Sequence, residues 1–272
     1  MLTTVADVAA AAERLWPASG AENWDAVGLI AGELGAPVSS ILLAVDAVLD
    51  TADEAIDQGA DMLLVHHPLL LRGVTSVSSD GYKGATLARL IRGHCALLAA
   101  HTNADVVETG TSAAFAARLG LTGVRPIVVG ETADRGIGRV GELPTPVTLG
   151  TLARALGDIL PATASGIRVA GSFDTVISTV ALCGGAGDAY LADPAVRAAD
   201  VYITSDLRHH PASEARENAR SGGGPALIDV SHWASEWLWL EGAAAELRAQ
   251  LPGVTITVSE LRTDPWDFAV VQ

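Results

Sequence analysis

The chain has 272 residues, and its 17 Lys and Arg against 32 Asp and Glu give a formal net charge of −15. This acidity argues against sequence-independent binding of DNA or RNA, which needs cationic side chains that displace phosphate counterions. Hydrophobic residues make up 49% and charged residues 18% of the chain, a balance that excludes an intrinsically disordered protein.

The first half of the chain alternates helix-like and strand-like segments. A helix is predicted after Thr4, which has the residue type of an N-cap and is followed three residues later by Asp7; Pro17 ends it. The strands that follow are almost continuously apolar, which is typical of a parallel sheet covered on both faces. We therefore expect a layered βαβ lobe. Its predicted strands are 40–45, 61–65 and 95–100, and its predicted helices are 48–58, 85–92 and 112–119.

The composition shifts towards Gly, Pro and Thr over residues 125–172, which indicates a change of lobe. Further along the chain the alternation of strands and helices resumes. The predicted fold class is α/β, with two linked α/β lobes built on largely parallel sheets. The first lobe is expected to be 1–125, completed by 226–272, and the second 126–225. The later predicted strands are 176–183, 201–204, 226–230 and 254–258, and the later predicted helices are 189–199, 212–220 and 232–250.

Histidines and carboxylates follow three of the predicted strands. His66 and His67 come directly after strand 61–65, and His101 follows strand 95–100, with Asp105 four residues later. His232 follows strand 226–230 in the same way. Ligands of open parallel sheets bind beyond the carboxyl ends of the strands, so these positions predict one built site.

His232 and Glu236 are four residues apart, so they share one face of the predicted helix 232–250. The neighbouring sequence is apolar on every side, which is typical of a buried helix. A buried imidazole and carboxylate are costly unless they pair or hold a metal ion. An ordinary hydrogen bond between the two side chains is the alternative.

Three His, one Asp and one Glu are a suitable ligand set for two divalent cations that share a carboxylate. A purely polar strand end is the alternative for His66 and His67, and an N-cap is the alternative for Asp105. No thiolate accompanies them, which excludes a tetrathiolate zinc site. Asp46, at the end of strand 40–45, could support the site or lie in a turn.

Weaker candidates lie in the second lobe. Gly184–Gly187 could cradle a phosphate on backbone N–H groups, although the segment lacks the lysine of a P-loop and a tight strand–helix turn explains it better. Thr204, Ser205 and Asp206, with His209 and His210 nearby, could position substrate or transfer protons; a loop cap and exposed polar residues are the alternative.

Six motifs in this order resemble those of the Nif-three-like (NGG-one-interacting factor three) dinuclear-metal family, whose bacterial members are named GTP cyclohydrolase I type-two homologues. They span nearly the whole chain. The motifs are Glu22–Leu29, Val65–Pro68, His101–Asp105, Cys183–Gly187, Thr204–Asp206 with His210, and Asp229–Glu236.

The resemblance implies two α/β lobes facing a central cleft, two divalent ions per chain (zinc, manganese, iron or similar) and a homohexamer. The implied metal ligands are His66, His67, Asp105, His232 and Glu236, with Glu236 bridging both ions. His101 then belongs to its motif without binding a metal. The chain departs from the family pattern at Ala26, Ser205 and His209, where the family has Asn, Gly and Tyr, and this puts the substrate contacts in doubt.

The function expected from the resemblance is metal-dependent hydrolysis, namely opening of the GTP purine ring with release of formate. His210 and His101 are the candidates for proton transfer, and Asp206, Gly185 and Gly187 for substrate binding. The alternatives are a metal-dependent phosphoesterase or amide hydrolase, and a non-enzymatic metal-binding hexamer that regulates or scaffolds partners. The expected substrate is a small nucleotide-like anion.

The expected location is the cytoplasm, with no membrane contact. No apolar run approaches the roughly 18 residues of a membrane span, and the first residues lack the basic start of a secretory signal. The two cysteines, Cys95 and Cys183, cannot form a disulfide framework.

Overall fold

A computed structural model describes residues 2–270. These residues form two compact units. Unit 1 consists of residues 2–107 and 240–263, and unit 2 consists of residues 108–239 and 264–270. Helix α9 (His232–Gln250) contributes its first eight residues to unit 2 and the rest to unit 1.

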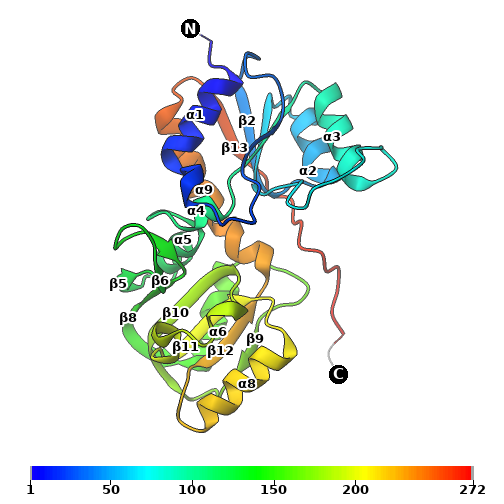
Figure 1. Cartoon of the computed structure of the whole chain (residues 1–272). Coiled ribbons are helices and arrows are strands. Elements are labelled where there is room, and N and C mark those ends of the chain that lie inside the picture. The colour runs from blue at the N-terminus through cyan, green and yellow to red at the C-terminus, as the bar shows by residue number, and fades with distance from the viewer. Residues whose placement is uncertain (1, 271–272) are drawn as a thin grey trace. The chain divides into compact units, whose positions relative to one another are not determined.

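Unit 1 is a sheet with helices on both faces (Figure 1). Its sheet has the strand order β1-β4-β3-β2-β13. Strands β4, β3, β2 and β13 are parallel, and β1 is antiparallel at the edge. The strands are β1 (Gly28–Ala31), β2 (Ser40–Asp46), β3 (Met62–His67), β4 (Ala96–Ala99) and β13 (Thr255–Val258). The helices are α1 (Val5–Leu15), the 3-10 helix η1 (Ala18–Gly20), α2 (Leu49–Asp57), α3 (Tyr82–Arg92), α4 (Thr102–Asp105) and the later part of α9.

Helix α1 begins as its sequence predicts. The Thr4 hydroxyl accepts the N–H of Asp7 at 3.3 Å, and the Asp7 carboxylate accepts the N–H of Thr4 at 2.9 Å. This capping box satisfies donors that have no partner inside the helix. The predicted helix is therefore confirmed.

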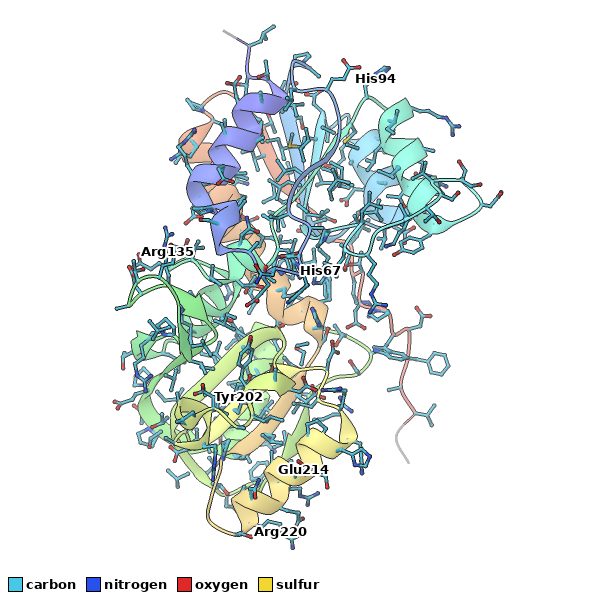
Figure 2. The ribbon with its side chains drawn as sticks, in the orientation of Figure 1. His67, His94, Arg135, Tyr202, Glu214 and Arg220 are labelled. Carbon is cyan, nitrogen blue, oxygen red and sulfur yellow. The ribbon has the colours of Figure 1, made fainter. Side chains whose placement is uncertain are left out.

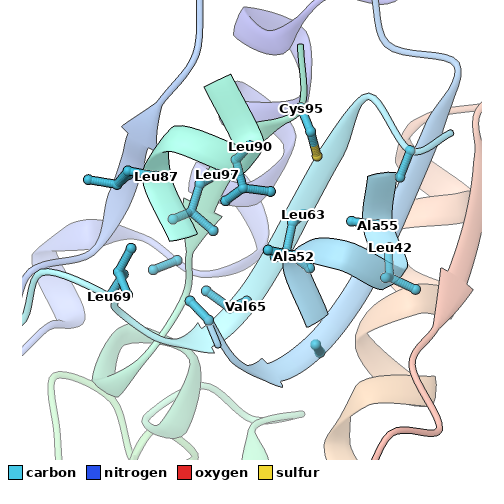
Figure 3. Close-up of a cluster of buried hydrophobic side chains, with 14 residues drawn as sticks. Leu42, Ala52, Ala55, Leu63, Val65, Leu69, Leu87, Leu90, Cys95 and Leu97 are labelled. Atoms are coloured by element: carbon cyan, nitrogen blue, oxygen red, sulfur yellow. The ribbon is translucent and has the colours of Figure 1, made fainter. Parts of the chain in front are cut away.

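The strands of unit 1 bury side chains on both faces, which explains their continuous apolar pattern. On one face, Leu42, Leu63 and Leu97 of adjacent strands pack under helices α2 and α3 (Figure 3). Because side chains alternate along a strand, Ile41 and Leu64 point to the opposite face, where Figure 1 shows α1. Parallel β3 and β4 then end at the same edge of the sheet.

Unit 2 contains a mixed sheet of strand order β5-β8-β10-β11-β12-β9 and a small antiparallel pair β6-β7. Its strands are β5 (Thr122–Arg125), β6 (Val128–Val129), β7 (Gly136–Ile137), β8 (Arg139–Thr148), β9 (Arg168–Ala170), β10 (Val176–Ala186), β11 (Val201–Ser205) and β12 (Ala226–Val230). Its helices are α5 (Thr111–Arg118), α6 (Leu149–Ile159), the 3-10 helix η2 (Asp188–Tyr190), α7 (Pro194–Arg197), α8 (His209–Arg220) and the start of α9.

One face of this sheet carries a core that includes Ala181, Tyr202 and Leu227 from three neighbouring strands. Ala215 of α8 and Val196 of α7 pack against it. The ends of β11 and β12 lead directly into the segments that hold Asp206 and His232.

The expectation of largely parallel sheets is wrong for this chain, because both sheets are mixed. In unit 2 only the pairs β10-β11 and β11-β12 are parallel, whereas β5, β8 and β9 all pair antiparallel. An apolar pattern reports burial on both faces, and β10 is buried on both faces although its partner β8 runs the other way.

The boundaries of the two compact units differ from those of the predicted lobes. The first lobe was expected to be 1–125 with 226–272, and the second 126–225. Strand β5 lies in the second sheet because it pairs with β8, and β12 does so because it pairs with β11. The predicted helix 189–199 is two short helices, since Pro194 lacks an N–H and starts a new helix. Within residues 2–270, no helix combines the length and the apolar character needed to cross a bilayer.

Candidate metal centre

Three histidines of unit 1 gather at one edge of its sheet. His66 and His67 are the last two residues of β3, and His101 follows β4, the parallel neighbour of β3. The ring centroids of His66 and His67 lie 5.0 Å apart, and each lies 5.1 or 5.4 Å from the centroid of His101. One ring nitrogen from each histidine lies within 4.8 Å of the other two, close enough for a shared metal ion. Figure 2 shows His67 at this end of its strand.

Each of the three imidazoles is anchored through Nδ1. Nδ1 of His66 lies 2.9 Å from the carbonyl oxygen of Ala100, that of His67 lies 2.8 Å from Oδ1 of Asp46, and that of His101 lies 2.9 Å from Oδ1 of Asp25. Carbonyl and carboxylate oxygens only accept, so each Nδ1 donates its proton. The lone pair of a neutral ring is then on Nε2, which is thereby available to a metal ion.

Asp25 is a buried carboxylate whose role the sequence did not reveal. Its side chain is fully buried, and besides His101 it accepts the N–H of Ala26 at 2.7 Å, the N–H of Thr102 at 3.0 Å and the hydroxyl of Thr102. Burial raises the pKa of Asp25, but the hydrogen bonds from Thr102 and His101 outweigh it and the pKa lies below its ordinary value. Asp25 is therefore an ionised anchor.

His101 itself is mostly buried. Burial and the neighbouring imidazoles of His66 and His67 lower its pKa more than Asp25 raises it. A lowered pKa keeps His101 neutral near pH 7, which leaves a lone pair on Nε2.

Asp105 is the last residue of helix α4, which follows β4 at the same edge of the sheet. Its Oδ1 lies 3.7 Å from Nε2 of His66. The alternative of an N-cap is wrong, because α5 begins at Thr111 with Gly110 at its N-cap. Asp46 is likewise no simple turn residue, since it holds His67 and also accepts the hydroxyl of Thr263.

The other two predicted ligands lie in unit 2. His232 is the first residue of α9 and Glu236 lies one turn later, with Nε2 of His232 3.0 Å from Oε1 of Glu236. Burial lowers the pKa of His232, but the carboxylates of Glu236 and Asp206 outweigh it and the pKa lies well above its ordinary value. The two side chains are thus within hydrogen-bond distance, Glu236 is buried and His232 is partly exposed, and the carboxylates favour the charged form of the imidazole.

Asp206 orients His232. Its Oδ2 lies 2.7 Å from Nδ1 of His232, so this histidine is anchored like the three in unit 1. Asp206 has φ +56°, a left-handed conformation that non-glycine residues rarely adopt and that marks functional sites. The hydrogen bond from His232 outweighs burial and lowers the pKa of Asp206. Substrate binding by Asp206 stays a prediction.

Gly185 leaves space for the pair. It has φ +70°, and a Cβ there would lie 2.4 Å from Oε1 of Glu236 and 3.2 Å from Nε2 of His232. Its N–H donates to Oγ of Ser235 at 2.9 Å, and the N–H of Gly184 donates to Oγ of Ser112 at 3.1 Å. Both N–H groups are thus used within the protein, and both glycines lie in strand β10 rather than in a strand-to-helix turn.

The remaining predicted site residues are less closely tied to this centre. Gly187 permits close packing, because a Cβ there would lie 2.3 Å from the hydroxyl of Tyr202, which donates to the Gly187 carbonyl at 2.9 Å. Ser205 is fully buried with its Oγ 3.5 Å from that of Ser235. His209 and His210 are exposed on α8, and within residues 2–270 His210 forms no hydrogen bond or ion pair.

The residues present fit divalent metal ions. The donors are imidazole nitrogens and carboxylate oxygens, which suit zinc, iron or manganese. All four histidines have Nδ1 bonded to a backbone carbonyl or an aspartate. Such outer partners fix ring orientation and tautomer in metal sites.

Curated proteins provide the first comparison. A Streptomyces coelicolor protein named GTP cyclohydrolase 1 type 2 homolog is 45% identical over 96% of this chain and 93% of its own length. A Mycobacterium leprae protein of the same name is 32% identical, and the match covers 98% of this chain and 96% of that protein.

Solved structures provide the second comparison. A Staphylococcus aureus hypothetical protein superposes with a TM-score of 0.89 at 27% identity, covering 99% of this chain and all of that one. A Bacillus cereus protein related to NIF3 gives the same TM-score and coverage at 22% identity, a likeness of fold. The family model of Duf34/NIF3 (NGG1p interacting factor 3) matches residues 3–265. The chain therefore belongs to the Duf34/NIF3 family.

Proposed function

We propose that this protein is a hydrolase that uses two divalent metal ions per chain. The proposed ligands are His66, His67 and Asp105 from unit 1 and His232 and Glu236 from unit 2, with Glu236 bridging both ions. The proposed reaction is opening of the GTP purine ring with release of formate. The resemblance also implies a cleft between the lobes, where these ligands meet, and a homohexamer; both are part of the proposal.

The observation that carries the proposal is the shared anchoring of the histidines. Asp46 and Asp206 hold Nδ1 of His67 and His232, and the carbonyl of Ala100 holds Nδ1 of His66. Loss of such partners typically weakens metal binding about 10- to 100-fold, which is why metal sites retain them. Burial alone would also require a hydrogen-bond partner for each ring, but here every partner is on Nδ1, which leaves Nε2 as the ligand atom.

When bound, divalent ions would lower the pKa of bound water towards about 7 and would polarise an oxygen of the substrate. This chain's own residues orient the ligands and move protons. The candidates for proton transfer are His101, which is neutral and mostly buried, and His210 on α8. Asp206, Gly185 and Gly187 remain the proposed substrate contacts.

The charge balance permits an anionic substrate. The four positive charges of two divalent ions would offset the carboxylates of Asp105 and Glu236 together with the anchoring carboxylates of Asp25 and Asp206. The net charge of −15 opposes the approach of a triphosphate. Exposed charges beyond a Debye length of about 8 Å are largely screened at physiological salt, so direct contact with the ions, rather than the net charge, decides whether an anion binds.

Incubation of the metal-loaded protein with GTP tests the reaction. Mass spectrometry should detect formate and a dihydropterin triphosphate. Glu236→Gln, which keeps the size of the side chain but removes the bridging charge, should reduce turnover at least about a hundredfold, because a transition-state interaction of about 2.7 kcal/mol is worth that factor. His94→Asn is the control, since His94 is exposed and lies in unit 1 away from His67 (Figure 2). Absence of both products with an active reference enzyme would refute GTP opening.

Two alternatives use the same metal ligands. One is a phosphoesterase or amide hydrolase, and the other is a metal-binding hexamer that regulates or scaffolds partners. The exposed position of His210 on α8 favours the second, because this candidate for proton transfer is held by no hydrogen bond or ion pair within residues 2–270. A substrate screen on the wild type and His232→Ala separates them. Turnover that the variant loses indicates an enzyme, whereas a flat screen with intact metal binding indicates a scaffold.

A further inference from the structure

We infer that two copies of this chain exchange residues 264–270, so that this segment of each copy adds a strand to the edge of the unit 2 sheet in the other. The acceptor is the β9–α8 groove, which lies in unit 2 between edge strand β9 and helix α8. Such an exchange requires self-association, as the proposed homohexamer does, but neither a metal ion nor turnover.

The β9–α8 groove has a volume of about 410 Å³, within the range of sites that hold a ligand. The register of β9 and β12 pairs Ala170 with Leu227 and Arg168 with Asp229, so these four side chains lie on one face of the sheet. The wall on α8 is formed by residues three or four positions apart, which share one helix face. They include His209, Ala212, Ser213 and Arg216. The groove therefore has an apolar floor and a charged rim.

Strand β9 leaves one edge of its backbone open. Its only partner is β12, and within residues 2–270 its N–H and C=O groups form no backbone hydrogen bond on the other side. Every second residue of an edge strand directs these groups outward, where another strand can pair with them. Val169 is 43% exposed, in agreement with an open edge. An extended peptide that enters between such an edge and a helix gains main-chain hydrogen bonds as well as side-chain contacts.

Segment 264–270 has the residue pattern of a strand, but it belongs to no helix or strand of the described chain. Trp266, Phe268 and Val270 alternate with other residues, so in an extended backbone they point to one side. Their side chains are 63%, 80% and 74% exposed. Figure 1 shows the segment as an extended stretch of chain near the end marked C. Large apolar side chains that are grouped and exposed in this way mark an interaction site.

The start of the segment is fixed, which lowers the entropy that pairing would cost. Oδ2 of Asp264 accepts the hydroxyl of Ser231 at 2.5 Å, and Oδ1 of Asp264 accepts the N–H of Trp266 at 3.1 Å. Pro265 restricts its own backbone and that of Asp264 to extended conformations. The segment and the groove both belong to unit 2, yet no residue of the segment lines the groove. The single chain thus leaves both surfaces open, and a second copy would cover both at once.

The charges of the two surfaces are complementary. Segment 264–270 contains two Asp and no Lys or Arg. The groove of this otherwise acidic chain carries Arg168, whose side chain is 69% exposed above buried Asp229, and Arg216, which forms no ion pair within residues 2–270. Guanidinium groups also stack on aromatic rings such as those of Trp266 and Phe268. The groove therefore suits an acidic, aromatic segment.

Reciprocal exchange also gives a closed pair. A two-fold axis uses every contact twice, so two segments and two grooves are covered together. Seven extended residues span about 23 Å at roughly 3.3 Å per residue. The face of α8 between residues 209 and 216 is about 11 Å long at 1.5 Å per residue. The segment is thus long enough to cover the groove.

Disulfide trapping tests the contact. Phe268→Cys and Ser213→Cys are made in separate chains, mixed in a glutathione redox buffer and separated by non-reducing electrophoresis; the native Cys95 and Cys183 are buried. The mixture should give at least about ten times more linked pairs than a mixture of Phe268→Cys with Glu214→Cys, because Glu214 is exposed on another face of α8 (Figure 2). Equal yields, or no linked pair, would overturn the inference. A link that forms only within one chain carrying both substitutions would also overturn it, since the segment would then bind its own groove.

Sedimentation at a series of protein concentrations measures the contribution to assembly. Trp266→Ser/Phe268→Ser should raise the dissociation constant at least about a hundredfold, because each aromatic anchor of an interface typically carries more than a tenfold change. Ser213→Trp, which fills the groove without changing the segment, should weaken association too, whereas Glu214→Trp should not. Circular dichroism verifies that each variant is folded.

Unchanged association in Trp266→Ser/Phe268→Ser would overturn the exchange and leave the proposed homohexamer standing on other surfaces. A wild type that sediments as a single chain at every concentration would overturn both. Protein treated with a chelator should associate like the metal-loaded protein. Failure of GTP opening therefore does not affect this test, and failure of this test does not affect the proposed hydrolysis.

Discussion

His101 in unit 1 and His232 in unit 2 each have Nδ1 bonded to an aspartate, and burial lowers the pKa of both. Their other neighbours differ. His101 faces the imidazoles of His66 and His67, which oppose a further positive charge, and its pKa lies below the ordinary value. His232 faces the carboxylates of Glu236 and Asp206, and its pKa lies well above that value. The same residue type with the same kind of anchor is thus neutral in one unit and charged in the other.

The difference bears on metal binding because a ligand must be deprotonated. The neutral histidine of unit 1 can bind an ion without releasing a proton, whereas His232 must first give its proton up. The anchors differ too. Asp25 is fully buried and held by several donors, whereas Asp206 is largely exposed and lies in a left-handed backbone conformation. Unit 1 therefore offers the more fully prepared half of the proposed centre.

Gly185→Ala should have the largest effect, because it disturbs the His–Glu pair of unit 2 and leaves the histidines of unit 1 unchanged. The new Cβ would lie 2.4 Å from Oε1 of Glu236, and the residue would keep φ +70°. Overpacking of about 2 kcal/mol and backbone strain of about 1 kcal/mol should lower the free energy of unfolding by about 3 kcal/mol. Urea denaturation measures this loss.

Gly166→Ala is the matched control for that substitution. Gly166 has φ +61° but nothing lies within 4 Å of a Cβ placed there. Only the strain of about 1 kcal/mol should remain. Equal losses in the two variants would show that the contact with Glu236 is not the cause.

The role of Asp206 can be separated from its backbone conformation. Asp206→Gly removes the carboxylate but accepts φ +56° without strain. Because the anchor of His232 is lost, affinity for the ion held by unit 2 residues should fall about 10- to 100-fold. Asp206→Asn keeps an acceptor and tolerates the left-handed conformation, so its loss should be smaller. Calorimetry measures both, and wild-type affinity in Asp206→Gly would contradict the anchoring role.

The sequence predicts the histidines of unit 1 but not the role of Asp25, and the reason is physical. His66, His67 and His101 follow apolar strands, and the carboxyl ends of parallel neighbours β3 and β4 meet, so local patterns suffice. Asp25 lies 76 residues before His101, and no local pattern links the two. The anchoring of His232 by Asp206 could not be predicted either, because the left-handed backbone of Asp206 and its bond to His232 exist only in the folded chain.

For the sheets too, local patterns predict some features, and others depend on contacts between distant segments. The apolar runs correctly predict β2, β3 and β4 in unit 1, where strand pairing is mostly parallel. Burial on both faces gives β10 the same pattern beside an antiparallel partner, so strand direction could not be predicted from it. The exposed edge strand β5 carries little apolar signal. Pairing between strands distant in sequence decides these features.

The smallest expected effect is a difference in proton titration between His101 and His232 after metal is removed with a chelator. The raised pKa of His232 means that its stabilising ion pair is fully present below the unfolded value of about 6.5 and is lost as pH rises through the folded pKa. The lowered pKa of His101 has the opposite sign, because the unfolded chain takes up a proton more readily as pH falls below about 6.5. His232→Gln should therefore flatten the loss of stability on the alkaline side, and His101→Gln the loss on the acid side. Imidazole NMR resonances should show His101 losing its proton at lower pH than His232, and the reverse order would mean that the carboxylates of unit 2 do not control the charge of its histidine.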